Sequence, residues 1–375
     1  MRVVLRGGGT GGHAYPAIAI AQELQAIKNS SKCELLYLGS KGSLEERLAR
    51  SVGLLFKGLP GRQLARRFSP EIVLTMATLV RGFAEAMYWL GKFKPDLVIS
   101  TGGYVSASVV LAQAVRRGLI LIHEQNVIPG RTNLWLSRFA SRICLTFEDS
   151  IHYFPASKSI VTGLPVRPDL IQLPEQEEAR KALGLDTELF TVLVIGGSQG
   201  ARKLNDVVTE SIAALASLPI QILHQSGERN YDEVCIKQKA MGCRNYHVRA
   251  YIDEMALAYA AADLVVARCG ASTVAEVTCV GLPAIFVPYP YAYADHQTYN
   301  GKFVARRGAA LLIPEKELTA EKLVDAITKL MTSPETLAKM REASKSLGKP
   351  NAAKDIVSLA LQMIEEQRCV RRAND

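Results

Sequence analysis

The chain of 375 residues is poor in the features that mark secreted, metal-binding and membrane-spanning proteins. Its seven cysteines, at positions 33, 144, 235, 243, 269, 279 and 369, never form a C-x-x-C pair. Scattered cysteines argue against a disulfide framework or a zinc site and favour buried thiols in a reducing compartment such as the cytoplasm. No run approaches the roughly 18 apolar residues that a transmembrane helix needs, so we expect none.

Motifs of several enzyme classes are also absent. The sequence has no H-x-x-x-H or H-E-x-x-H pair and no P-loop lysine. These absences argue against a metal site and a P-loop NTPase. The net charge is +9, but no nucleic-acid recognition motif or aromatic-rich basic stripe accompanies it. We therefore expect no nucleic-acid partner.

What the chain does have is a glycine-rich loop at the start of each half. Gly7–Gly12 follows the apolar run Val3–Leu5, and Gly196–Gly200 follows Phe190–Ile195. A strand that ends in glycines and opens onto a helix suits phosphate, because the backbone N–H groups at the helix N-terminus point at the anion. A dinucleotide site would also need an acidic residue at the end of the second strand, and neither half has one there. This argues against an NAD or FAD enzyme, while glycines that serve only tight turns remain the alternative.

Short apolar strands alternate with amphipathic helical stretches along the whole chain. This order predicts an α/β fold with parallel sheets covered on both faces, and the length predicts two domains. The glycine and two prolines within residues 163–168 mark the linker. We expect strands at 3–5, 35–38, 97–100, 119–123 and 143–146 in the first domain, and at 191–195, 220–224, 247–250, 264–266 and 284–287 in the second.

Four segments carry hydrogen-bonding side chains where an expected strand ends. Residues 270–276 open a helix, so the helix N-terminus suits a phosphate, and Glu276, one turn in, suits the hydroxyls of a ribose. Segments 101–104, 123–126 and 295–300 also follow strands, where α/β proteins bind ligands. The first two are typical of a site lining, and the polar groups of the third suit a sugar. The alternatives are that Glu276 only offsets the helix dipole and that His123 is held in structural hydrogen bonds.

These segments together resemble one known family. They read GGGTGGH, TGGYVS, HEQN, GLPVR, GGSQGA, ARCGASTVAE and DHQT across residues 1–365. In this order they are similar to the MurG family, the bacterial UDP-N-acetylglucosamine (UDP-GlcNAc) transferases of glycosyltransferase family 28. Each motif alone is unspecific, whereas the combination is highly specific.

The resemblance implies a GT-B fold, in which two Rossmann-like domains face a central cleft. Residues 1–163 would face the acceptor and the membrane, residues 164–350 would bind UDP-GlcNAc, and a C-terminal helix at about 351–371 would pack back on the first domain. The implied reaction is an inverting transfer of GlcNAc from UDP-GlcNAc to lipid I (undecaprenyl-pyrophosphoryl-MurNAc-pentapeptide). It forms the β-1,4 link of lipid II in peptidoglycan synthesis, with no metal or other cofactor. The expected location is the cytoplasmic face of the inner membrane, as a peripheral protein, with other cell-wall synthesis proteins as candidate partners.

The resemblance also implies which residues contact the substrates. The donor and the acceptor diphosphate would be approached by Thr10, Gly11 and Gly12, and the donor diphosphate would also be contacted by Arg167 and Ser198. The uracil would meet the Ile252 backbone, and the phosphate and ribose would meet Ala271, Ser272, Thr273, Val274 and Ala275, with Glu276 on the ribose hydroxyls. The donor sugar would be contacted by Asn126, and its GlcNAc hydroxyls by Gln297. Thr298 stands where many relatives have a second glutamine, so at this position the sequence departs from the family pattern.

An inverting transfer needs a base that takes the proton of the acceptor hydroxyl and positive potential that stabilises the departing UDP. With no metal expected, Arg167 and the helix N-termini would supply the potential. We expect His13 to be the base, with Glu124, acting directly or through His13, as the alternative. A histidine that only binds the acceptor diphosphate is a further alternative.

Other functions remain open at this point. A UDP-GlcNAc 2-epimerase has a two-domain fold of this kind and would turn over without an acceptor. A non-catalytic sugar-nucleotide-binding protein would bind and not react. A related synthase that glycosylates diacylglycerol belongs to the same class of enzyme.

The first domain carries the positive charge. Residues 1–165 contain 20 Lys and Arg against 10 Asp and Glu, a net charge of +10, and residues 166–375 contain 25 against 26. Between Arg62 and Lys94 the helical stretch Ile72–Leu90 is apolar around more of its surface than one buried face needs. Such a stretch lies on a membrane interface, and the flanking basic residues favour anionic headgroups. We expect the anionic cytoplasmic leaflet as a partner, with an ordinary core helix as the alternative.

Overall fold

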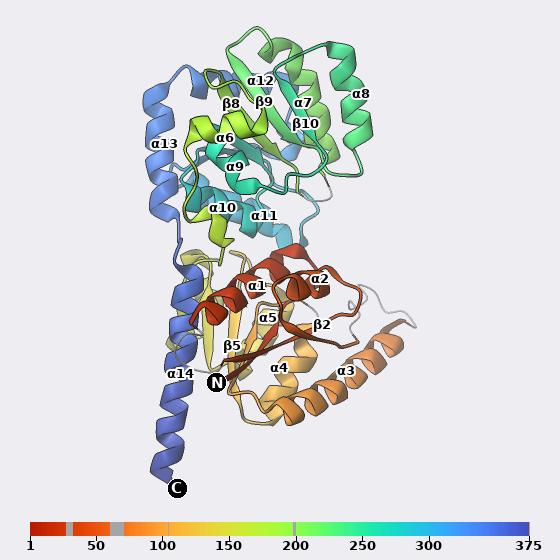
Figure 1. The fold of residues 1–375 in the computed structure, drawn as a ribbon, viewed down its shortest axis with the longest axis vertical. Helices are drawn as coiled ribbons and strands as arrows, with labels where there is room; N and C mark the ends of the chain where they lie inside the picture. Colours follow the sequence, from red (N-terminus) through yellow and green to blue (C-terminus); the bar gives the residue numbers. More distant parts are fainter. Residues whose placement is uncertain (28–32, 61–70, 104, 198–199, 375) are drawn as a thin grey trace. The chain divides into compact units, whose positions relative to one another are not determined.

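The computed structural model describes residues 1–27, 33–60, 71–103, 105–197 and 200–374. The chain forms two compact units, which Figure 1 shows in sequence colours. Unit 1 consists of Met1–Arg167 and Lys349–Asp375, and unit 2 of Pro168–Gly348. The chain therefore passes between the units at 167/168 and 348/349, a few residues from the expected 163/164 and 350/351. Among the described residues, none of the helices combines the length and the apolar character needed to span a bilayer.

Unit 1 is built on a seven-stranded parallel sheet in the order β3-β2-β1-β4-β5-β6-β7. Its strands are β1 (Arg2–Arg6), β2 (Glu34–Gly39), β3 (Leu55–Gly58), β4 (Leu97–Ser100), β5 (Leu119–Glu124), β6 (Arg142–Leu145) and β7 (Ser159–Val161). The sequence predicted five of them and missed the edge strands β3 and β7, which are short and not continuously apolar. The order reverses between β1 and β4, so the loops after these two strands open at the topological switch point, where such sheets bind ligands.

The helices of unit 1 divide over the two faces of this sheet. Alternate strand residues face opposite sides, and Val3 and Leu5 share a core with α1 (Gly11–Ala26), α2 (Leu44–Ser51) and α14 (Ala352–Asn374). Val4 instead shares a core with α3 (Glu71–Phe93) and α4 (Ser106–Val115), and α5 (Arg131–Leu136) packs beside α4. The C-terminal helix α14 thus belongs to unit 1, alongside α1 (Figure 1).

Unit 2 repeats the plan with six parallel strands in the order β10-β9-β8-β11-β12-β13. They are β8 (Phe190–Ile195), β9 (Ile220–Gln225), β10 (Tyr246–Arg249), β11 (Leu264–Ala267), β12 (Ala284–Phe286) and β13 (Ala310–Leu312). Only the edge strand β13 was not predicted. Here the order reverses between β8 and β11, so the second switch point lies where the Gly196 loop and residues 268–270 leave the sheet.

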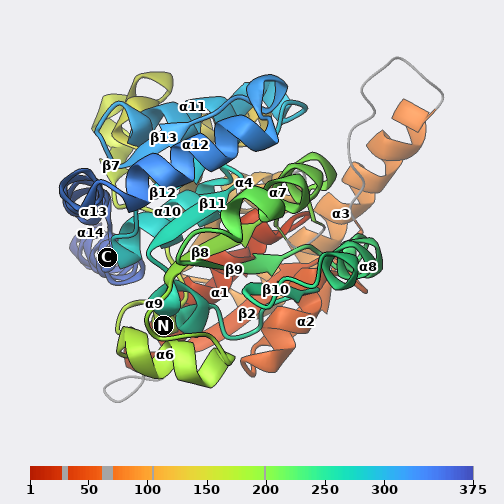
Figure 2. The same cartoon turned by 90° about the horizontal axis from the view of Figure 1, so that it is seen from above.

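The helices of unit 2 also cover both faces of its sheet. They are α6 (Gln176–Leu183), α7 (Arg202–Leu215), α8 (Tyr231–Met241), α9 (Met255–Ala261), α10 (Ala271–Val280), α11 (His296–Ala305), α12 (Ala320–Met331) and α13 (Pro334–Leu347). Figure 2 shows α7 between α12 and α8, and α8 next to the edge strand β10. Short 3-10 helices connect elements of both units at Ser137–Phe139, Glu148–Tyr153, Ala156–Lys158, Pro168–Leu170, Tyr293–Asp295 and Glu315–Glu317.

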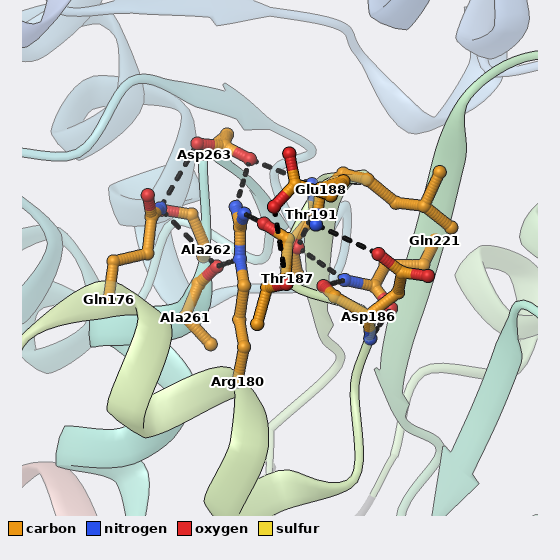
Figure 3. A network of polar contacts seen from close by, with 11 residues as sticks. Gln176, Arg180, Asp186, Thr187, Glu188, Thr191, Gln221, Ala261, Ala262 and Asp263 are labelled. Carbon is orange, nitrogen blue, oxygen red and sulfur yellow. Dashed lines mark hydrogen bonds and ion pairs between the residues drawn. The ribbon is translucent and has the colours of Figure 1, made fainter.

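A buried ion pair fixes the amino-terminal edge of the unit 2 sheet (Figure 3). Arg180 of α6 donates from Nη2 to Asp263 Oδ2 at 2.6 Å, from Nε to the Ala261 carbonyl at 3.1 Å and from Nη1 to the Thr187 carbonyl at 2.6 Å. The same Asp263 oxygen accepts the Thr191 N–H of β8 at 2.8 Å. We call Arg180 and Asp263 the clamp, since they tie α6, the end of α9 and the start of β8 together.

Candidate functional site

Three loops of unit 1 meet at the switch point after β1, β4 and β5. The loops after β1 and β4 lie in close contact, since a Cβ on Gly7 would lie 1.9 Å from Thr101 Oγ1 and 2.5 Å from the His13 carbonyl. Gly103, at a φ of 88°, has no room for a side chain either, because its Cβ would lie 2.1 Å from the Gly8 carbonyl. These glycines are thus needed for loop packing, which brings the 7–13 and 101–103 loops together. This packing places the half-buried His13 beside Thr101.

The hydrogen bonds of the His13 ring define which nitrogen carries the proton. Nδ1 lies 2.9 Å from the Thr101 carbonyl and 2.9 Å from Gln125 Oε1. Both partners can only accept, so Nδ1 donates. The neutral imidazole then has its lone pair on Nε2, which makes Nε2 the basic atom.

The orientation of the Gln125 amide is set by its other partners. Three acceptors surround its Nε2, which has two hydrogens to share among them: the Thr101 carbonyl at 2.6 Å, the His123 carbonyl at 3.1 Å and His123 Nδ1 at 3.1 Å. This arrangement turns Oε1 towards His13. His123 in turn donates from Nε2 to the Gly163 carbonyl at 2.9 Å. Burial lowers the pKa of His123 to about 4, so this ring stays neutral and its Nδ1 remains an acceptor. The sequence alone assigns no role to Gln125, because its role depends on this tertiary contact.

Glu124, the alternative base, lies in a different environment. Its buried carboxylate accepts the backbone N–H groups of Asn126 at 3.0 Å and Gly130 at 3.2 Å, and the side-chain amide of Asn133 at 2.8 Å. Burial raises the pKa of this carboxyl, and those hydrogen bonds act in the opposite direction. The carboxylate therefore holds the 124–133 loop in shape, and with it the half-buried Asn126.

The remaining expected residues of the first glycine loop lie at the start of α1. Thr10 is the N-cap residue, and its carbonyl accepts from the His13 and Ala14 N–H groups at 3.2 Å each. Its side chain is exposed, and a Cβ on Gly12 would meet only Thr10 Oγ1, at 3.9 Å. The N-terminus of α1 thus has space in front of it for an anion.

A second candidate site, which lies in unit 2, is the N-terminus of α10. Gly270 is the N-cap residue, so the N–H groups of Ala271, Ser272 and Thr273 have no partner within the helix. The side chain of Ala271 is buried, which leaves its backbone N–H as its means of meeting a ligand. Val274 is buried as well, and its N–H donates to the Gly270 carbonyl at 2.9 Å. Ser272 Oγ is buried and has no hydrogen-bond partner among the described residues.

Glu276 lies one turn into α10 and is half-buried. The hydroxyl of Tyr259 in α9 donates to its Oε2 at 2.9 Å. Sequence reasoning missed Tyr259, since no pattern links a buried tyrosine to an acidic residue of the next helix.

A cavity of about 560 Å³ lies beside this helix N-terminus. Its lining includes glycines of the two unit 2 loops that follow β8 and β11, together with Arg202, Lys203, Arg268, Thr273, Tyr289, Gln297 and Glu315. Arg268 is buried, donates to the Pro288 carbonyl at 3.1 Å, pairs with Glu315 and lies 5.7 Å from the centre of the Tyr289 ring. Sequence reasoning passed over Arg268, although it lies directly before the predicted phosphate turn. The wall thus combines cations, helix N-termini and amide groups, as a phosphorylated sugar requires.

The other expected donor contacts are placed as follows. The Ile252 N–H donates to Gln225 Oε1 at 2.9 Å, and Gln297 Oε1 accepts from the Tyr289 N–H at 2.9 Å. Thr298 donates to Asp295 Oδ1 at 2.6 Å, within the first turn of α11. Arg167 is the last residue of the first segment of unit 1. Ser198 lies outside the described residues, as do the basic positions 62, 66 and 67.

Comparisons with known proteins agree over the length of the chain. Residues 3–145 match the glycosyltransferase family 28 N-terminal domain, and residues 191–356 match the glycosyltransferase family 28 C-terminal domain. A protein of Desulforudis audaxviator, named UDP-N-acetylglucosamine--N-acetylmuramyl-(pentapeptide) pyrophosphoryl-undecaprenol N-acetylglucosamine transferase, is 43% identical over 96% of this chain and 97% of its own length.

Solved structures show the same fold. MurG of Acinetobacter baumannii has a TM-score of 0.76 at 31% identity and covers 96% of this chain and 99% of its own. The UDP-GlcNAc 2-epimerase of Neisseria meningitidis has a TM-score of 0.69 at 15% identity, covering 96% and 100%, a likeness of fold alone. The expected GT-B fold is thereby confirmed. The chain belongs to glycosyltransferase family 28.

Proposed function

We propose that this protein is an inverting glycosyltransferase that moves GlcNAc from UDP-GlcNAc to lipid I and forms the β-1,4 link of lipid II. The observation that carries this proposal is the 43% identity, over nearly the full chain, to a relative named as the transferase of that reaction. The described site agrees with it, because both switch points present helix N-termini and polar side chains suited to anionic sugar substrates. The epimerase alternative is supported by a solved epimerase structure that is 15% identical to this chain, a similarity that shows the fold alone.

In the proposed reaction His13 is the general base. Its Nε2 takes the proton of the acceptor hydroxyl, whose oxygen attacks the anomeric carbon of GlcNAc. The bond from that carbon to the diphosphate oxygen breaks on the opposite face, and UDP leaves with the electron pair. The Nδ1 donor bonds to Thr101 and Gln125 stabilise the imidazolium that forms. Glu124 keeps the loop in place, which is why we assign the proton transfer to His13.

Unit 2 is the proposed donor-binding unit. The N-terminus of α10, residues 271–275, faces phosphate and ribose, and Glu276 accepts from the ribose hydroxyls. Because Gln225 holds the Ile252 N–H, we assign the uracil contact to the Ile252 carbonyl. In this proposal Gln297 and Asn126 contact the donor sugar, and Thr10, Gly11 and Gly12 approach the donor and the acceptor diphosphate. Arg167 and Ser198 contact the donor diphosphate and stabilise the departing UDP.

Unit 1 is the proposed membrane-facing unit. In α3, Ala86 and Leu90 are buried against the sheet, whereas Val80 and Tyr88 are 63% and 60% exposed. An exposed apolar surface on a helix with basic neighbours suits the interface of an anionic leaflet. We propose that α3 docks the protein peripherally on the cytoplasmic face of the inner membrane, where lipid I is held.

A transfer assay tests this function. The full chain is incubated with labelled UDP-GlcNAc and a short-chain lipid I analogue, in excess chelator, and the product is separated from the donor. We expect label in a lipid II analogue, with no effect of the chelator. Epimerised donor in a parallel reaction without acceptor, or turnover that requires added Mg²⁺ or Mn²⁺, would contradict the proposal.

A further inference from the structure

The contact between α9 and α10 has a consequence for nucleotide recognition. Tyr259 is 1% exposed, and its hydroxyl donates to Oε2 of the half-buried Glu276 at 2.9 Å. A carboxylate on a long side chain rotates about its last bonds unless a partner holds one oxygen. The Tyr259 hydroxyl provides such a partner, so the plane of the carboxylate is fixed before a ligand arrives.

The position of Tyr259 is itself fixed from behind. Arg180 Nε donates to the carbonyl of Ala261, the last residue of α9, at 3.1 Å, and Arg180 pairs with Asp263 just beyond it (Figure 3). Gln176 adds hydrogen bonds from its Nε2 to the Ala262 carbonyl at 3.3 Å and to Asp263 Oδ1 at 3.1 Å. The clamp therefore anchors the helix end two residues from Tyr259, on the side of the sheet remote from the ligand.

We propose that Tyr259 is a positioning residue that gives this protein its selectivity for a ribonucleotide over a 2′-deoxyribonucleotide. The inference rests on the proposed role of Glu276 as the acceptor of the ribose hydroxyls. A carboxylate held in one orientation accepts two neighbouring hydroxyls without losing rotational freedom on binding. Removal of the Tyr259 hydroxyl takes away one partner of the carboxylate, so the carboxylate is less restrained until a ribose binds.

Calorimetric titration with UDP and with 2′-deoxy-UDP tests this on the full chain. Tyr259→Phe should weaken UDP binding about 2- to 10-fold, the cost of ordering one side chain, and should weaken 2′-deoxy-UDP binding less, because that nucleotide offers Glu276 one hydroxyl instead of two. The ratio of the two affinities therefore falls. The matched control is Tyr246→Phe, which removes another buried hydroxyl of unit 2, one that lies 2.8 Å from His224 Nδ1 and away from α10. That variant should keep the parent ratio.

A double-mutant cycle separates positioning from general destabilisation. In a Glu276→Ala background the Tyr259→Phe change should no longer alter UDP affinity, because the group it positions is gone. An unchanged affinity ratio in Tyr259→Phe, or an equal loss in both backgrounds, would overturn the inference while leaving the role of Glu276 intact. An unchanged ratio in Glu276→Ala itself would instead remove the ribose contact on which the inference rests.

Discussion

At the scale of single residues, the chemistry of unit 1 depends on which atoms of two histidines carry protons. His123 is buried and donates from Nε2 to a carbonyl, so its Nδ1 accepts from Gln125. Gln125 then presents an oxygen to His13. A protonated His123 would offer a donor in place of an acceptor and would turn the amide around. Burial keeps the pKa of His123 at about 4, which protects the arrangement at neutral pH.

The base assignment predicts a specific loss in His13→Ala. Turnover should fall by roughly 10²- to 10⁴-fold, the usual contribution of a general base, while UDP affinity stays near the parent value. His152→Ala is a suitable control, because His152 is an exposed histidine of the same unit. Steady-state kinetics with a lipid I analogue and calorimetry with UDP measure both quantities. A His13→Ala rate within a few-fold of the parent would transfer the role to Glu124.

At the scale of elements, the switch-point loops of unit 2 and the clamp lie at opposite ends of one sheet. The Gly196 loop and the start of α10 lie at the carboxyl ends of β8 and β11, and the clamp lies at the opposite ends. Arg180 and Asp263 have side chains that are 8% and 18% exposed. Their attraction is therefore little screened, and either partner alone would be a poorly solvated charge.

Asp263→Ala should accordingly destabilise unit 2. Removal of one partner of a buried pair costs about 3–5 kcal/mol of unfolding free energy, because the other charge is left unpaired. Both tryptophans, Trp89 and Trp135, lie in unit 1, so far-UV circular dichroism during urea unfolding detects the change and tryptophan fluorescence shows whether unit 1 shares it. The control is Glu177→Ala, which removes an exposed ion pair with Lys181 on the same helix. Equal urea midpoints for the two variants would contradict the stabilising role of the clamp.

At the scale of the whole molecule, the net positive charge is concentrated in the first half of the sequence. The first 165 residues carry a net charge of +10, and the remainder carry −1. Exposed basic residues near a membrane are attracted to anionic headgroups by about 1 kcal/mol each, an attraction that salt weakens. A protein with this distribution should therefore approach an anionic leaflet with unit 1.

Sedimentation with anionic vesicles tests the membrane proposal. The parent should co-sediment, less so at high salt, and an Arg66→Glu, Arg67→Glu variant should bind more weakly. Lys339→Glu, Arg341→Glu makes the same charge change at exposed positions of α13 in unit 2 and should bind like the parent. No binding by the parent, or an equal loss in both variants, would exclude the segment before α3 as the dock.

Much of the fold was predictable because its determinants are local. Apolar runs that end in glycine define strand, loop and helix within about ten residues, and the sequence predicted ten of the thirteen strands seen among the described residues. The three that were missed, β3, β7 and β13, are short edge strands that exist through pairing with a neighbour. Motif order likewise predicted the family, since it is a property of the sequence alone.

The contacts that make a site were decided by the tertiary structure. Nothing local links Gln125 to His13, Tyr259 to Glu276 or Gln225 to the Ile252 N–H. These pairs arise because strands distant in sequence become neighbours in a parallel sheet, and sheet order and register then determine which side chains meet at its carboxyl edge. The sequence by itself determined which residue types stand at the strand ends, whereas the packing of strands and helices decided which atom donates to which.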